Sequence, residues 1–141
     1  MHAIAWRACS DFDLCNGVAM RLVFPEEWKS ISRPHVRAEL MAFLASASQD
    51  QRGDRAELEF LVHFIFDDHD FERASELVGD VLIDASEIEP VQLFVRVLDA
   101  AIGPRQKPLS AVSNQELLAI NDAAGAALQK LMHNGLATFS V

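Results

Sequence analysis

Residues 56–66 read AELEFLVHFIF, and the fold class depends on whether this stretch forms a helix or a strand. A half-buried strand would explain the alternation of Leu58, Phe60, Val62, Phe64 and Phe66. A helix explains the pattern equally well, because one face would carry Leu58, Leu61, Val62 and Ile65. A strand needs a partner for its backbone hydrogen bonds, and only residues 20–24 offer one. Since two strands alone are marginally stable in water, we predict a buried helix here.

Apolar residues recur at helical spacing on both sides of this stretch. A helix is predicted from near Ser32, a candidate N-cap, with Pro34 in its first turn and apolar positions up to Ala47. After the sequence DDHD, residues 72–83 are predicted to form a short helix that Gly79 weakens.

The C-terminal half contains two further helices. Ser86 is a candidate cap for the first, which Gly103-Pro104 would end. Residues 113–116 form a capping box at the start of the last helix, and Asn134-Gly135 would cap its end. We therefore predict an all-α fold, a compact bundle of about five helices. An α+β fold with a small strand pair is the alternative if residues 57–66 are extended.

The chain has 141 residues, which is enough for one domain with its own core. We assign residues 20–141 to a single helical domain and residues 1–19 to an N-terminal extension, because Met20 opens a more ordinary N-terminal sequence. The spacing of Cys9 and Cys15 matches no zinc or redox motif. No apolar run is long enough to span a membrane and no signal-peptide pattern is present, so we expect a cytoplasmic protein.

Negative charge is concentrated in the middle of the chain. The sequence has 21 acidic and 12 basic residues, a formal charge of −9, which disfavours nucleic acid and anionic membranes as partners. Residues 67–89 hold nine of the acids and one base, Arg73. A solvated helix face would explain this window, but so would a surface that attracts a basic protein. The candidate partner contacts are Asp67, Asp68, Asp70, Glu72, Glu76 and Asp80.

The same stretch also offers side chains that bind metal ions. Imidazole and carboxylate groups together suit a borderline divalent ion such as zinc, and His63 and Asp67 would share a helix face. The spacing matches neither H-E-x-x-H nor an EF-hand loop, and aspartates are also common in turns and caps. A metal-dependent enzyme or metal-binding protein is therefore the alternative function, with the candidate ligands His63, Asp67, His69 and Asp70.

No nucleophile elbow, P-loop or dinucleotide-binding glycine pattern occurs in the sequence. We therefore expect a non-enzymatic protein without a cofactor. A homodimer in which apolar faces complete each other's core is a further possibility. Trp28 is expected to anchor the core, although an exposed tryptophan could instead mark an interface.

Residues 63–71, HFIFDDHDF, resemble the motif H-F-[LIF]-[FY]-D-D-x-D-[LF] of a family of small uncharacterised acidic bacterial proteins. The likeness extends over residues 28–103, where an acidic helix and a Val/Leu-rich helix follow the motif. The family brings no established activity. Small acidic proteins of this kind are similar to immunity proteins, so the resemblance implies a protein that neutralises a basic toxin.

Overall fold

The computed structural model describes residues 14–15, 18–19, 21–49, 55–102 and 111–140. The α-helices are α2 (Pro34–Ala47), α3 (Arg55–Val62), α4 (Ile88–Ile102) and α5 (Asn114–Met132). Shorter helical segments are η1 (Glu26–Ser30), η2 (His63–Asp68), η3 (Phe71–Leu77) and η4 (Ala85–Glu87). The strands are β1 (Leu14–Cys15), β2 (Val18–Ala19), β3 (Arg21–Val23) and β4 (Thr138–Ser140). The predicted all-α bundle is confirmed, and the small strand pair β3–β4 that accompanies it does not involve residues 57–66, which are helical.

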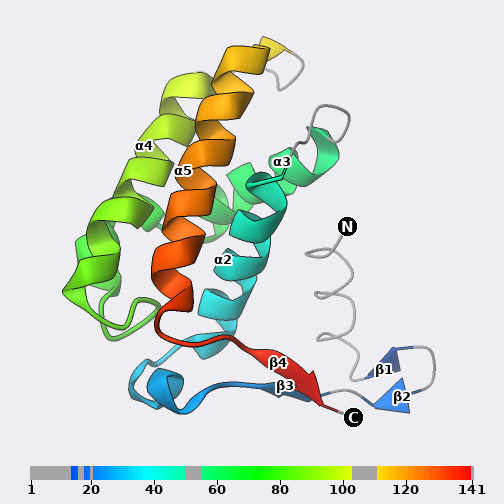
Figure 1. The fold of residues 1–141 in the computed structure, drawn as a ribbon, viewed down its shortest axis with the longest axis vertical. Helices are drawn as coiled ribbons and strands as arrows, with labels where there is room; N and C mark the ends of the chain where they lie inside the picture. The colour runs from blue at the N-terminus through cyan, green and yellow to red at the C-terminus, as the bar shows by residue number, and fades with distance from the viewer. Residues whose placement is uncertain (1–13, 16–17, 20, 50–54, 103–110, 141) are drawn as a thin grey trace.

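The helix α5 packs against both α4 and α2, and α4 also packs against η3. Figure 1 shows α4, α5 and α2 side by side, with the antiparallel pair β3–β4 at the end of the bundle where α5 finishes. No helix among the described residues is long and apolar enough to cross a bilayer. Most of the predicted extension, residues 1–19, lies outside the described residues, and so does the predicted stop at Gly103-Pro104.

The decisive stretch 56–66 is helical, as predicted, but it is not one regular helix. The helix α3 continues into η2, which has the wider turns of a π-helix over six residues. Such turns are rare and occur mostly as single-turn insertions. In η2 they accompany the burial of two consecutive side chains, Phe64 and Ile65. Neither apolar alternation nor helical spacing in the sequence predicts this widening.

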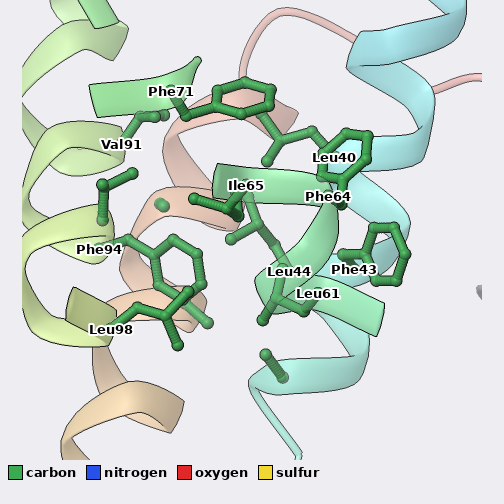
Figure 2. Packing of buried hydrophobic residues seen from close by; sticks show 14 of the residues in the cluster. Leu40, Phe43, Leu44, Leu61, Phe64, Ile65, Phe71, Val91, Phe94 and Leu98 are labelled. Carbon is green, nitrogen blue, oxygen red and sulfur yellow. The ribbon is translucent and has the colours of Figure 1, made fainter. Parts of the chain in front are cut away.

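Aromatic and aliphatic side chains from five segments form the centre of the core. Figure 2 shows Leu40, Phe43 and Leu44 of α2 facing the labelled side chains of α3, η2, η3 and α4. The ring of Phe64 lies 5.0 Å from that of Phe43 and 5.4 Å from that of Phe71, between centroids. Burial of each such side chain contributes about 1.5–3 kcal/mol, so this contact network holds η2 and η3 in place.

The structure corrects three predicted helix boundaries. The helix expected over residues 72–83 ends at Leu77, because Val78 is extended and Gly79 takes a positive φ of 88°. Arg33, not Ser32, occupies the N-cap position of α2. Asp84 caps the turn after it by accepting a hydrogen bond from the backbone N–H of Ser86, the predicted cap. The capping box at Ser113, by contrast, is present as predicted.

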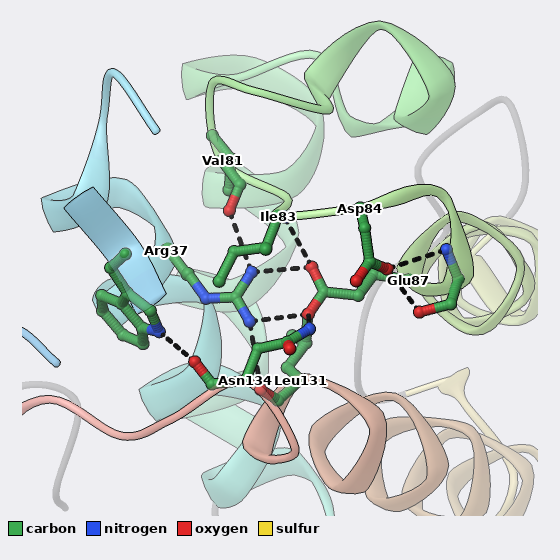
Figure 3. A network of polar contacts seen from close by, with 9 residues as sticks. Arg37, Val81, Ile83, Asp84, Glu87, Leu131 and Asn134 are labelled. Carbon is green, nitrogen blue, oxygen red and sulfur yellow. Dashed lines mark hydrogen bonds and ion pairs between the residues drawn. The ribbon is translucent and has the colours of Figure 1, made fainter. Parts of the chain in front are cut away.

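A buried ion pair connects the helices at the end of the bundle. The Arg37 guanidinium donates two hydrogen bonds to the Glu87 carboxylate, with Nη1–Oε1 at 2.8 Å and Nη2–Oε2 at 2.7 Å. Both side chains are 0% exposed. Arg37 also donates to the carbonyl oxygens of Val81 and Leu131, and Glu87 accepts from the Asn134 side chain (Figure 3). The pair therefore joins α2, η4 and the end of α5.

We expect Glu87→Gln to destabilise the fold by about 3–5 kcal/mol, because it leaves the Arg37 charge buried without a counter-ion. Chemical denaturation measures this loss. The matched control is Glu26→Gln, which removes the carboxylate of an exposed pair with Lys29 and should cost at most about 1 kcal/mol. Equal losses in the two variants would show that the buried pair does not hold the bundle end together.

The two described glycines with positive φ are expected to differ in their tolerance of alanine. A Cβ at Gly79 would meet nothing within 4 Å, whereas a Cβ at Gly135 would lie 2.7 Å from Pro25 Cγ. Gly79→Ala should therefore cost only the backbone strain, about 1–2 kcal/mol, and Gly135→Ala measurably more. Thermal unfolding of both variants tests this order, and the reverse order would contradict the close approach of Gly135 to Pro25.

Candidate functional site

The acidic window 67–89 separates into carboxylates used inside the molecule and carboxylates left at its surface. Glu87 is buried on Arg37, and Asp84 caps a turn. Asp80 accepts hydrogen bonds from Arg33 Nε at 2.8 Å, from Arg33 Nη2 at 2.6 Å and from Ser32 Oγ at 2.5 Å. Asp80 was one of the six predicted partner contacts, but its charge is already matched within the chain.

The other five predicted contacts are exposed and follow one another along η2, the link after it and η3. We call this set the acidic edge: Asp67, Asp68, Asp70, Glu72 and Glu76.

The backbone of η3 explains why the carboxylates of this edge face solvent. The segment η3 consists of two short 3₁₀ turns joined by a kink at Arg73, where φ is −110° and ψ is 61°. Phe71, Ala74 and Leu77 are buried along it, and the positions between them are exposed. In η2 the buried pair Phe64 and Ile65 likewise precedes the exposed residues 67 and 68. Packing of apolar side chains therefore fixes where the acidic edge lies.

Among the described residues, little positive charge opposes the acidic edge. Asp67 Oδ2 lies 2.5 Å from His63 Nδ1, and Glu76 Oε2 lies 3.9 Å from Arg73 Nη1, but these pairs are exposed and contribute little. Within the described residues, no cation pairs with Asp68, Asp70 or Glu72. Asp70 stands at the N-cap position of η3 without making a side-chain capping bond. Local capping therefore does not account for this carboxylate.

The four candidate metal ligands do not converge. His63 is exposed and pairs with Asp67, whereas the His69 ring packs edge-on against Phe64 at 4.8 Å. The same His69 places Nδ1 3.5 Å from Arg33 Nη1, next to a cation. Across the described ranges, no three histidine, cysteine, aspartate or glutamate side chains are grouped so that they could hold a metal ion.

Arg33 is a site residue that the sequence did not reveal. Its guanidinium donates hydrogen bonds to Asp80, which lies 47 residues further along the chain, and no motif marks either residue. Hydrogen bonds from Arg33 and Ser32 hold the pKa of Asp80 below its ordinary value. The same bond to Asp80 raises the pKa of Arg33. Trp28, in contrast, is buried in the core as predicted.

The Asp80 interaction should make part of the stability depend on pH. Because the folded-state pKa of Asp80 is lowered, its contribution is present above the unfolded pKa of about 3.9 and is lost as the pH falls through the folded value. We therefore expect Asp80→Asn to be less stable than wild type near neutral pH, with the difference shrinking at acid pH. Denaturation curves at several pH values test this, and a difference independent of pH would contradict it.

Comparison of the chain with protein-family models, with curated protein sequences and with solved structures gives no match. The resemblance based on residues 63–71 therefore stays an expectation.

Proposed function

We propose that this protein is a non-enzymatic binding domain whose acidic edge receives a basic surface of a protein partner. The observation that carries the proposal is the exposure of five carboxylates on one short segment, three of them without a cation among the described residues. Crowded like charges repel one another, and a basic partner would relieve this repulsion. Such a partner would also be captured faster through electrostatic steering.

The expected partner surface carries lysine or arginine side chains. Arginine suits carboxylates through paired hydrogen bonds, and lysine through a mobile point charge. The segment is held by buried Phe64, Phe71 and Leu77, so the carboxylates of the acidic edge are positioned before the partner arrives. A pre-positioned charged surface loses less conformational entropy on binding than a mobile one.

The resemblance at residues 63–71 supports a more specific form of the proposal. In this form the protein is an immunity protein, and the basic partner is a toxin with a cationic substrate-binding surface. Covering that surface would block the toxin without any chemistry by the binding domain. No observation favours the alternative metal-dependent function, since its four candidate ligands do not converge.

Charge reversal at the acidic edge tests the proposal. The test variant is Asp68→Lys/Asp70→Lys/Glu72→Lys, and the matched control is Glu89→Lys/Asp99→Lys/Asp122→Lys, three exposed acids of α4 and α5. Both variants change the net charge equally. Binding of a hexalysine peptide, followed by NMR shifts of backbone amides, should weaken about tenfold at low ionic strength in the test variant and much less in the control.

Equal weakening in both variants would show that total charge, and not the acidic edge, attracts cations. The immunity form predicts that a gene for a basic toxin lies beside this one, and cells that express that toxin provide a separate readout. The wild type and the control variant should protect such cells, and the reversed variant should not. Protection by the reversed variant would remove the acidic edge from the mechanism.

A further inference from the structure

The chain leaves α5 and crosses the end of the bundle as a short segment, residues 135–140, which we call the C-terminal strap. This strap forms one wall of a pocket of about 360 Å³. Its contribution to the wall is Leu136, Ala137 and Phe139, and the opposite side includes Trp28, Ala38 and Met41. Every residue that lines the pocket is apolar. The lining residues therefore come from the strap, β3, η1 and the helices α2 and α5.

The residue directly before the strap is fixed to the bundle. The Trp28 indole N–H donates to the backbone oxygen of Asn134 at 2.8 Å. The Asn134 side chain donates to Glu87 Oε2, also at 2.8 Å, and so joins the buried ion pair (Figure 3). Removing Asn134 from its place would leave buried polar groups unpaired, which is costly.

The strap itself begins at a residue suited to act as a hinge. Gly135 has a φ of 99°, a conformation that only glycine adopts without strain. Hinges are commonly one or two residues at the end of an element that absorb the change in backbone angles. The fixed Asn134 and the permissive Gly135 stand next to each other, so a motion of the strap would start at this point.

Among the described residues, a short strand pairing and partly buried apolar side chains such as Ala137 hold the strap down. Its strand β4 pairs with β3 over three described residues, with Leu22 opposite Phe139 and Val23 opposite Thr138. An isolated two-stranded pair is marginal in water. Leu136 and Phe139 remain 51% and 41% exposed, so they gain only part of the free energy of apolar burial. Segments with few buried contacts open locally while the remainder stays folded.

We propose that the C-terminal strap is a lid that swings about Gly135 and controls access to the apolar pocket. Closed, it covers Trp28 and the α2 side of the pocket through Leu136 and Phe139. Open, it exposes an apolar cleft while the Arg37–Glu87 pair keeps α2 and α5 together. This inference does not depend on the acidic edge, whose residues belong to η2 and η3.

A reversible cross-link provides the test. Val23 and Thr138 are paired across the ladder and exposed, and neither lines the pocket. Cysteines at directly opposed strand positions have a separation that suits a disulfide. The test variant therefore carries Val23→Cys and Thr138→Cys. It also carries Cys9→Ser and Cys15→Ser, which prevent other disulfides. The oxidised and reduced forms of this protein differ only in the disulfide between β3 and β4, so each form is the matched control for the other.

Two measurements decide the outcome. In the reduced protein and in wild type, the amides of β4 should exchange hydrogen at least about tenfold faster than those in the middle of α5, and oxidation should slow them. The dye 1-anilinonaphthalene-8-sulfonate should fluoresce strongly with the reduced protein and weakly with the oxidised one. Exchange in wild-type β4 as slow as in α5 would overturn the hinge. Equal dye binding by the oxidised and reduced forms would overturn the control of access.

Discussion

The paired hydrogen bonds between Arg37 and Glu87 join α2 to η4 inside the bundle, where both charged groups are fully buried. Burial of a guanidinium and a carboxylate costs desolvation free energy, which hydrogen bonds to their remaining donors and acceptors offset. Here the carbonyl oxygens of Val81 and Leu131, the backbone N–H of Ile83 and the side-chain amide of Asn134 supply such bonds, and among the described residues only Arg37 Nε is left without one. One orientation of α2, η4 and α5 satisfies these groups, and a shifted packing would leave charge unmatched.

The Arg37–Glu87 pair also contacts Trp28 and Asn134. The Arg37 guanidinium lies 5.1 Å from the centre of the Trp28 ring, a cation–π distance. The ring of Phe24 is stacked on that of Trp28, with 5.6 Å between centroids. Through Trp28 and Asn134 the pair thus sets the position of η1 and the point where the C-terminal strap begins. The fixed side of the proposed hinge is a consequence of the same buried charges.

Features that depend on local interactions could be predicted from the sequence, and features that depend on long-range contacts could not. Apolar periodicity predicted α2, α4 and α5, because their buried residues, such as Val91, Phe94 and Leu98, are spaced by turns of the helix. The capping box at Ser113 was predictable because its bonds are local. The Arg37–Glu87 pair and the Arg33–Asp80 pair were not, because each joins residues about fifty positions apart that no local pattern couples. One signal existed for Arg37, which lies on the buried face of α2 with Leu40 and Leu44.

The division of the acidic window follows from the same distinction between local and long-range interactions. Counting charges in the sequence treats nine carboxylates as equivalent, yet Asp80 and Glu87 each meet an arginine of α2 or its N-cap. Asp80 and Glu87 differ from the carboxylates of the acidic edge in where the buried side chains around them lie. Phe71, Ala74 and Leu77 of η3 are buried, whereas Asp70, Glu72 and Glu76 are exposed and, among the described residues, form no ion pair with an arginine of α2 or its N-cap. Solvent, salt or a cationic partner can therefore offset the repulsion among these exposed carboxylates. Of the three, only a cationic partner would also be recognised through the positions of the carboxylates.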